Sequence, residues 1–266
     1  QAHRALLDEA RRLGLAVEGH VPLASTPTEA VAAGQRAIDH LTLVLESCVP
    51  GALGWTHAAA GPDADSMALL TDGRLASALQ GYDAAACDAQ FRRFVAAGTW
   101  HIPTLVQMRG MFALDDPAVF DNPDIALVPE AVRLEWAAYR KEAKPDELRA
   151  GRAVYARQLQ LVGDMHRAGV RLLAGTDAST EPHVVPGASL HDELALFVAA
   201  GLAPLEAIRA ATTDAARYAG DAPERIGWQV GATADLVLLS ADPRVDIHNT
   251  RAIEWVVQRG TAYSRA

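Results

Sequence analysis

The stretch VRLLAGTD (170–177) decides the fold of this sequence. Its nearly continuous apolar run is typical of a β-strand that is buried on both faces, as in the parallel sheets of α/β proteins. An amphipathic helical pattern precedes it at 148–169, and helical patterns follow at about 190–200 and 204–219. We therefore expect a strand flanked by helices, with the carboxylate of Asp177 at its C-terminal end.

The same alternation of helix and strand extends toward the N-terminus. Apolar residues recur at helical spacing over 1–13, and Gly14 follows as a helix stop. The segment TPTE (26–29) supplies an N-cap, a proline at the first helical position and a glutamate three residues after the cap. Alternation of this kind predicts a parallel sheet with helices packed outside it. The other expected elements are the strands LAVEGH (15–20), RAIDHL (36–41) and TWHIPTLV (99–106), and a helix over 88–98.

Two regions depart from this alternation. From Met108 to about Asp146, Pro, Asp, Asn and scattered aromatic residues indicate an insertion that covers part of the fold. After residue 222 strands follow one another without helices. We therefore predict two units, an α/β unit over 1–222 and a small β unit over 223–266. The strands of the second unit are expected at 234–240, 252–260 and 261–265.

The number of strands is small for the length of the first unit. A complete eight-stranded (β/α)8 barrel takes roughly 250 residues, whereas this unit gives only four strand–helix repeats. Four parallel strands cannot close a barrel. Either the sheet is open, or its remaining strands lie on sequence outside this chain.

Composition limits the classes of partner. Of 266 residues 50% are hydrophobic and 21% are charged, which is typical of a globular enzyme. The net charge of −9 opposes nucleic acid or an anionic membrane as a partner, and favours a small molecule or a peptide. No apolar run is long enough for a membrane-spanning helix. Because the chain opens on Gln1 rather than on methionine, its localisation cannot be read. The two cysteines, Cys48 and Cys87, are interpreted as buried apolar side chains, too few for a disulfide scaffold.

Three polar side chains stand at the C-terminal ends of expected strands: His20, His40 and Asp177. Functional groups gather at this edge in α/β barrels, and two imidazoles with a carboxylate suit a divalent ion such as zinc. A single histidine at a strand end is more often a hydrogen-bonded residue of a polar rim. Three such groups on three strands favour a metal site.

Longer motifs strengthen this interpretation. The segments LLAGTDA, GLAPLEAIRAAT and GATADLVLLSADP, with the ordered set GH, IDH, PT-L and GTD, resemble the amidohydrolase superfamily in its imidazolonepropionase-like and prolidase-like branch. The resemblance covers almost the whole chain. It implies a TIM-like (β/α)8 barrel with a small β-sandwich and one or two divalent metals. It assigns His20, His40 and Asp177 to the metal ligands of strands five, six and eight, with Asp177 also as the proton shuttle.

The sequence departs from that family in what it lacks. It has no counterpart of the His-x-His of strand one or of the bridging carboxylated lysine of strand four. Lys141 and Lys144, the only lysines, lie in the insertion after strand seven. We therefore expect a fragment with strands five to eight of a barrel and the remnant of a β-sandwich over 223–266. Such a chain should bind metal weakly on its own and catalyse little.

Other candidate residues carry less information. His183, in the loop after Asp177, either faces a substrate or is an exposed loop residue. The alternation of side chains does not decide which face of its strand His101 lies on. His191 fits a helix N-terminus better than a ligand position. Aromatic and methionine residues of the insertion either line an apolar pocket or pack between helices, and packing is slightly favoured. They are Met108, Met111, Phe112, Phe120, Trp136 and Tyr139.

The function predicted from these observations is hydrolysis of a carbon–nitrogen bond by metal-activated water. Its substrate would be a small amide, a cyclic amide or a dipeptide. One alternative is a catalytically inactive half-barrel remnant that serves as a structural or interaction module. Others are deacetylation of amino sugars and cleavage of an ester or lactone, which the shared motifs do not separate. Apolar edges left by missing strands would favour association into homo-oligomers.

Overall fold

The computed structural model describes residues 2–59, 73–178 and 182–264. Gln1 of the first expected helix and Arg265 of the last expected strand lie outside the described residues, as do residues 60–72, which precede the helix expected over 88–98. Within the described ranges, no helix combines the length and apolar character that a membrane crossing requires.

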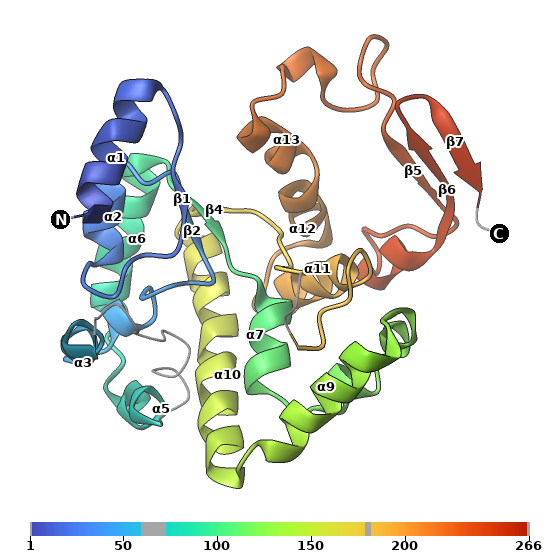
Figure 1. The fold of residues 1–266 in the computed structure, drawn as a ribbon. Coiled ribbons are helices and arrows are strands. Elements are labelled where there is room, and N and C mark those ends of the chain that lie inside the picture. The colour runs from blue at the N-terminus through green and yellow to red at the C-terminus, as the bar shows by residue number, and fades with distance from the viewer. Residues whose placement is uncertain (1, 60–72, 179–181, 265–266) are drawn as a thin grey trace.

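Four short strands form a parallel sheet in the order β1-β2-β3-β4 (Figure 1). This confirms the α/β class and the parallel arrangement predicted from the sequence. In the part of the chain that the structure describes, β1 and β4 each pair with one neighbour only, so the sheet is open. The strands are β1 (Glu18–Gly19), β2 (Ala37–Asp39), β3 (Trp100–Ile102) and β4 (Arg171–Leu172).

Helices connect the strands and pack against one another around the sheet (Figure 1). Contacts run from α2 to α6, from α7 to α10, and from α10 through α11 to α12. The predicted capping box of α2 is present, with the Thr26 hydroxyl accepting the Glu29 amide and the Glu29 carboxylate accepting the Thr26 amide. The principal helices are α1 (Ala2–Leu13), α2 (Pro27–Ala32), α3 (Ala52–Ala59), α5 (Arg74–Ala78), α6 (Ala84–Ala97), α7 (Leu105–Phe112), α8 (Pro117–Phe120), α9 (Glu130–Glu142), α10 (Pro145–Arg167), α11 (Ser189–Ala200), α12 (Pro204–Ala211) and α13 (Thr213–Ala219); the 3-10 helices include η1 (Glu46–Cys48), η2 (Leu79–Gly81), η3 (Pro123–Leu127), η4 (Pro223–Arg225) and η5 (Ile247–Arg251).

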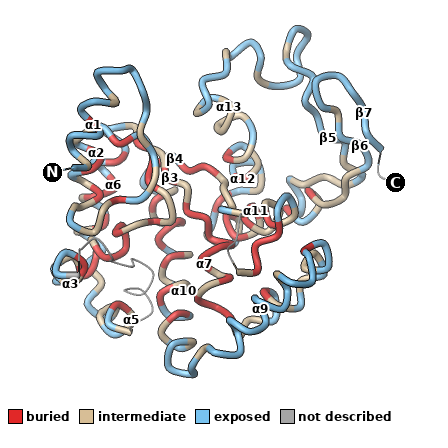
Figure 2. The backbone as a smooth tube through the Cα atoms, in the orientation of Figure 1, coloured by how far each residue is buried: buried red, intermediate tan, exposed pale blue. Residues whose placement is uncertain are grey.

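The core lies between the sheet and the helices that cover it. Figure 2 shows buried backbone concentrated along the strands, α7 and α10. Phe91 and Phe94 of α6, Leu161 and Met165 of α10, and Phe197 of α11 are fully buried members of one large hydrophobic cluster. This cluster fixes the helices against the sheet and so sets the position of each strand end.

Three features of the α/β unit differ from those expected. Leu105 and Val106 begin α7 instead of ending a strand, because Pro103 has no amide hydrogen for the strand ladder. The helix expected over 204–219 is divided at Thr212, which has non-helical dihedrals (φ −129°, ψ −94°). The insertion after β3 is largely helical and contains α7, α8 and α9.

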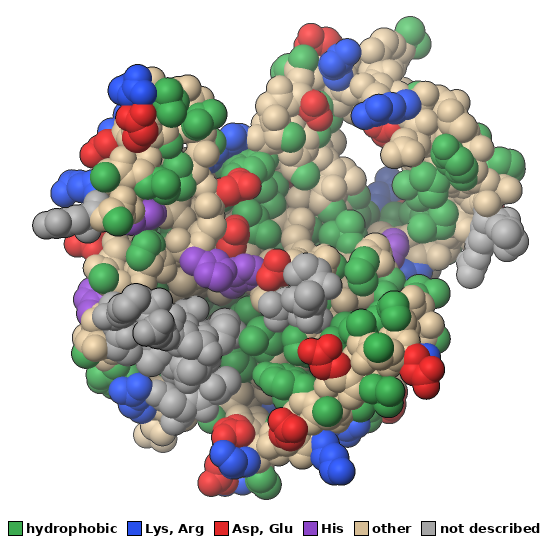
Figure 3. Space-filling view, in the orientation of Figure 1, with side chains coloured by type: hydrophobic (Ala, Val, Ile, Leu, Met, Phe, Trp, Pro, Cys, Tyr) green, Lys and Arg blue, Asp and Glu red, His purple; other side chains and the backbone are tan. Residues whose placement is uncertain are grey.

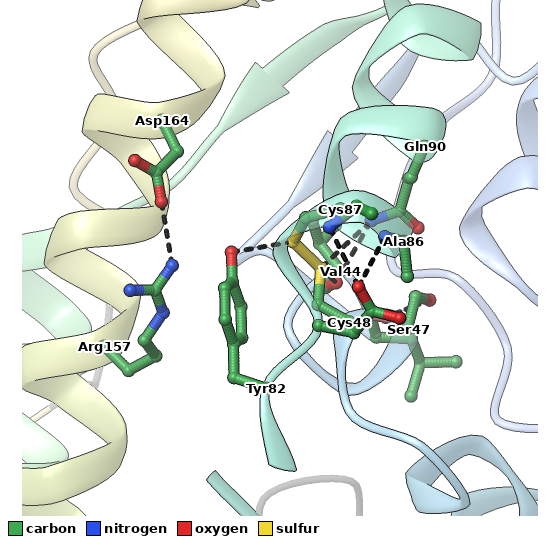
Figure 4. The surroundings of a disulfide bond; sticks show 12 residues. Val44, Ser47, Cys48, Tyr82, Ala86, Cys87, Gln90, Arg157 and Asp164 are labelled. Atoms are coloured by element: carbon green, nitrogen blue, oxygen red, sulfur yellow. Dashed lines mark hydrogen bonds and ion pairs between the residues drawn. A yellow bond between two sulfur atoms is a disulfide. The ribbon is translucent and has the colours of Figure 1, made fainter. Parts of the chain in front are cut away.

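The interpretation of the cysteines as unbonded apolar side chains is wrong. Cys48 and Cys87 are both buried, as expected, but they form a disulfide that joins η1 to α6. The sequence could not show this, because 39 residues separate the two. The Tyr82 hydroxyl donates to Cys87 Sγ at 3.0 Å, and the Tyr82 ring lies under the guanidinium of Arg157 (Figure 4).

The C-terminal strands form an antiparallel sheet in the order β5-β6-β7. Strands were expected in this region, and the 3-10 helix η5 between β5 and β6 was not. The sheet joins the rest of the chain through η5, where the Thr250 hydroxyl bonds His191 Nδ1 at 2.9 Å and Arg251 pairs with Asp192 at 2.8 Å. Most of its side chains are exposed, including large apolar ones. The strands are β5 (Leu236–Leu239), β6 (Ile253–Gln258) and β7 (Thr261–Ser264), and their exposed apolar residues include Leu236, Val237, Leu238, Trp255, Val256 and Tyr263.

His101 of β3 faces the helices. Its ring packs against Phe94 of α6 with 4.4 Å between centroids, and no described residue makes a hydrogen bond to either of its buried ring nitrogens. Burial lowers the pKa of His101 to about 3, because the charged imidazolium would lose its hydration.

We expect His101→Leu to reduce the acid sensitivity of the protein. In the unfolded chain a histidine has a pKa near 6.5, whereas in the folded chain the pKa of His101 is about 3. The unfolded state therefore takes up a proton first as pH falls, and stability falls below pH 6.5 by about 1.4 kcal/mol per unit. Urea denaturation at pH 7 and pH 4 measures how much free energy of unfolding is lost between the two pH values. This loss should be about 3 kcal/mol smaller in the variant than in the wild type. A control replacing His248, whose side chain is 71% exposed, should keep the wild-type difference; equal losses in His101→Leu and wild type would contradict the prediction.

Close packing of α10 on α11 depends on Gly163. A Cβ built at this position would lie 2.1 Å from the carbonyl oxygen of Ala200, at the end of α11. Gly54 of α3 offers the opposite case, since a Cβ there would meet no atom within 4 Å.

We expect Gly163→Ala to destabilise the protein by about 1–3 kcal/mol, because a backbone oxygen cannot move aside without shifting the helix. Gly54→Ala should leave stability unchanged or raise it by up to about 1 kcal/mol through helix propensity. Chemical denaturation of the two variants measures both effects, and a Gly163→Ala protein as stable as the Gly54→Ala protein would refute the packing argument.

Candidate functional site

The three side chains singled out at strand ends lie at one edge of the parallel sheet. His20 directly follows β1, His40 directly follows β2, and Asp177 lies in the segment after β4. In parallel sheets the carboxyl ends of the strands share an edge, which is where functional groups of α/β proteins collect. Figure 3 shows histidine side chains gathered near the middle of one face beside acidic side chains.

His40 is the centre of this arrangement. Its ring makes an edge-on contact with the ring of His20, with centroids 4.7 Å apart. On its other side, His40 Nε2 lies 3.8 Å from Asp177 Oδ2. The structure therefore brings all three predicted residues together as two adjoining pairs that share His40.

Two of these residues have unusual backbone conformations. His40 and Asp177 have φ angles of 55° and 52°, in the left-handed region that residues with a Cβ rarely adopt. Such conformations cost about 1–3 kcal/mol and persist where surrounding contacts hold them. The His40 amide donates to the carbonyl of Ile102 in β3 at 2.9 Å, which holds the His40 backbone at the sheet edge.

Sequence reasoning did not identify two further residues of this site, Thr104 and Gln107. Thr104 Oγ1 lies 2.7 Å from His40 Nδ1 and 3.0 Å from Gln107 Oε1. Gln107 Nε2 donates to Asp177 Oδ2 at 3.0 Å. The only signal for them was the PT-L motif at the end of β3, to which no role had been attached.

The electrostatic surroundings favour a neutral His40. Burial lowers the pKa of its imidazole, and the neighbouring His20 lowers it further. Burial also raises the pKa of Asp39, the residue before His40, and the nearby Glu18 carboxylate adds to that increase. A neutral imidazole is the form that binds metals.

The donor atoms suit a divalent metal, but they do not close around one point. Two imidazoles and a carboxylate are ligands of zinc and of similar ions, and Nδ1 of His40 is already bonded, which leaves Nε2 for a ligand role. Within the described ranges, however, no group of three or more His, Cys, Asp or Glu side chains is arranged to hold a metal ion. Residues from this chain thus provide two adjoining pairs of potential ligands.

His183 is not an exposed loop residue. It is buried, its ring packs against Trp136 of α9 with centroids 5.4 Å apart, and neither ring nitrogen has a hydrogen-bond partner among the residues that the structure describes. Burial lowers the pKa of His183 to about 4. Met108, Phe112 and Trp136 of the insertion are buried too, whereas Tyr139 is exposed.

A separate cleft of about 750 Å³ lies at the opposite ends of the strands. Its lining includes Arg36, Trp100 and Arg171, at the starts of β2, β3 and β4, together with residues of α12 and α13. Since none of the residues around His40 lines it, we place the candidate site at the carboxyl edge of the sheet.

Comparison with solved structures gives the same architecture. A bottromycin amidohydrolase superposes with a TM-score of 0.68 at 28% identity, over 98% of this chain and 52% of its own. A Xaa-Pro dipeptidase with bound methionine gives 0.59 at 16% identity, over 99% of this chain and 48% of its own. A prolidase complexed with N-methylphosphonate-L-proline gives 0.58 at 22% identity, over 99% and 48%. The chain thus spans about half the length of the structures it matches.

No curated protein matches the sequence significantly. The model of the amidohydrolase family matches residues 2–260, which is nearly the whole chain and includes His20, His40 and Asp177. With the parallel sheet and the prolidase-like structural neighbours, this match confirms the resemblance seen in the motifs. The chain belongs to the amidohydrolase family.

Proposed function

We propose that this chain carries part of the active site of a metal-dependent hydrolase that cleaves carbon–nitrogen bonds in small amides, cyclic amides or dipeptides. The observation that carries the proposal is the position of His40 Nε2, 3.8 Å from Asp177 Oδ2 at the carboxyl edge of the sheet, with the His20 ring beside it. Family membership supports the reaction class, and the dipeptidase and amidohydrolase neighbours support a small-molecule or dipeptide substrate.

We assign β1 to β4 to strands five to eight of a TIM-like barrel, and residues 223–266 to a composite β-sandwich. The chain matches about half of each related structure, and four strands are half of the number in a (β/α)8 barrel. The exposed apolar residues of β5, β6 and β7 support a sheet that packs against further strands. The other metal ligands would then come from outside these residues.

In the proposed site His20, His40 and Asp177 would hold a divalent metal together with ligands from outside these residues, and zinc fits the ligand types. When bound, such a metal lowers the pKa of a water molecule toward about 7 and polarises the substrate carbonyl. Asp177 accepts the proton of the attacking water and then donates it to the leaving nitrogen, as general base and general acid. The amide of Gln107 holds Asp177 Oδ2, which orients the carboxylate.

We place His183 on the substrate side of the site. It follows Asp177 by six positions in the sequence, and its two buried ring nitrogens have no hydrogen-bond partner within 2–59, 73–178 and 182–264. Buried polar atoms are normally satisfied, so a polar group of a substrate would complete the hydrogen bonding of this imidazole.

The proposal predicts that zinc binding to this chain is weak and depends on His40. Titration calorimetry should detect zinc binding to the wild type that His40→Ala abolishes, because the shared ligand of both pairs is lost. His248→Ala, at an exposed position, should bind as the wild type does. Stoichiometric tight zinc in His40→Ala would refute the assigned ligands.

Activity is tested on the protein that the whole gene encodes, including any sequence that adjoins this chain. The substrates are Xaa-Pro dipeptides, N-acyl amino acids and cyclic amides. A chelator should abolish hydrolysis, and Asp177→Asn should lower kcat by about 10²–10⁴, the usual contribution of a general acid–base. Turnover that survives both treatments would exclude the proposed mechanism. An intact protein that binds no metal and hydrolyses none of these would favour the alternative, a catalytically inactive module.

A further inference from the structure

Glu193 of α11 is a carboxylate buried in the interior. Its relative exposure is 0%, and both of its oxygens accept backbone amides, Oε1 from Leu105 at 3.0 Å and Oε2 from Val106 at 2.7 Å. Burial raises the pKa of Glu193 to about 8, so a carboxylate here costs free energy that an apolar side chain would avoid. An apolar side chain would, however, leave two buried amide hydrogens unsatisfied.

These two amides are the first of α7, and helix N-termini lack internal acceptors for them. The residue at the N-cap position, Thr104, makes no side-chain cap, although threonine is a good capping residue elsewhere. Its φ of 47° places it in the left-handed region, and its hydroxyl turns toward His40 and Gln107 instead. Glu193 therefore supplies the cap that Thr104 does not.

The hydrogen bonds around Thr104 have a direction. Gln107 gives its NH₂ group to Asp177, so its Oε1 faces Thr104 as an acceptor. The carbonyl of Pro103, 2.8 Å from Thr104 Oγ1, can also only accept. If the single hydroxyl proton goes to one of these two oxygens and His40 donates to Thr104 Oγ1, two of the three contacts are hydrogen bonds, whereas a proton given to His40 would satisfy only one and leave Oγ1 without a donor. The first arrangement is therefore favoured. His40 then carries its proton on Nδ1, and its Nε2 lone pair is free on the side of Asp177.

We propose that Glu193 is a positioning residue: by capping α7 it frees the Thr104 hydroxyl to hold His40 in the Nδ1–H form, with Nε2 open toward Asp177. The inference rests on the proposed function for its purpose, since an unprotonated Nε2 is what a metal ligand requires. The hydrogen-bond arrangement itself does not depend on that function.

The test is the tautomer of His40, read by long-range ¹H–¹⁵N NMR of the metal-free chain labelled with ¹⁵N-histidine, with His40→Gln to assign the signals. In the wild type we expect the Nδ1–H form in about tenfold excess, the preference that one buried hydrogen bond gives. Thr104→Val should lose this excess, and Thr104→Ser, which keeps the hydroxyl, should restore it.

Glu193→Gln tests the positioning role directly. Its amide can accept only one of the two backbone amides and sets its own NH₂ group against the other, so α7 should shift and the His40 tautomer excess should fall. Asp83→Ala is the matched control, because Asp83 also accepts two backbone amides at a helix N-terminus, those of Ala85 and Ala86 in α6. It should lower the denaturation midpoint and leave the His40 signals unchanged.

Two results would overturn the inference: a wild-type His40 protonated on Nε2, or a folded Glu193→Gln protein whose His40 signals equal those of the wild type. If Glu193→Gln does not fold, the Thr104→Val and Thr104→Ser pair decides whether the hydroxyl sets the tautomer. Cobalt titration of the same proteins is a separate arm. Absence of cobalt binding in the wild type would count against the proposed metal site, while the ring-nitrogen signals would still decide the role of Glu193.

Discussion

The parallel pairing of β2 with β3 is the constraint on which the candidate site depends. Its register places Asp39 opposite Ile102, and the His40 amide extends the ladder to the Ile102 carbonyl. The segments that follow β2 and β3 therefore leave the sheet at the same level. His40 and Thr104, 64 residues apart in sequence, meet at 2.7 Å because of this alignment. A slip of one residue would send the side chains to opposite faces and separate the imidazole from its partner.

The sequence predicted those residues of the candidate site that a local pattern marks. It missed the residues whose role depends on contacts between distant segments. His20, His40 and Asp177 each end an apolar run, so the pattern of one short segment was sufficient to select them. Thr104 and Gln107 act through partners 64 to 70 residues away, and Glu193 through amides 87 and 88 residues away. No local pattern distinguishes Glu193 from an ordinary helix glutamate, because its role appears only when α11 packs against α7.

The same distinction explains the errors in the fold. Helix boundaries with their own signals, such as the TPTE cap of α2, agreed with expectation. The start of α7 did not agree, because β3 and α7 form one apolar stretch. Pro103 ends the strand ladder there, and Glu193 of α11 accepts the first two amides of the helix. The disulfide was missed for a related reason: pairing of Cys48 with Cys87 depends on how η1 packs against α6. Contacts between distant elements decided each of these features.

These distant contacts hold the segments that carry the site independently of any metal. After His40, the chain is fixed to α6 by the Cys48–Cys87 disulfide and by Gln90, whose amide donates to the Val44 carbonyl at 3.1 Å. After β3, the chain is fixed by Glu193.

After Asp177, the loop is packed by Val185 against Val128 and Trp136 of the insertion. Contacts of the described residues thus restrain a part of each of these three segments before a ligand binds, and this lowers the entropy that a bound ion or substrate must overcome. The remaining freedom lies with His20, whose ring contacts His40 but whose side chain makes no hydrogen bond to another described residue. His20 is therefore the residue whose position should respond most to occupation of the site, and His40 the one that should move least.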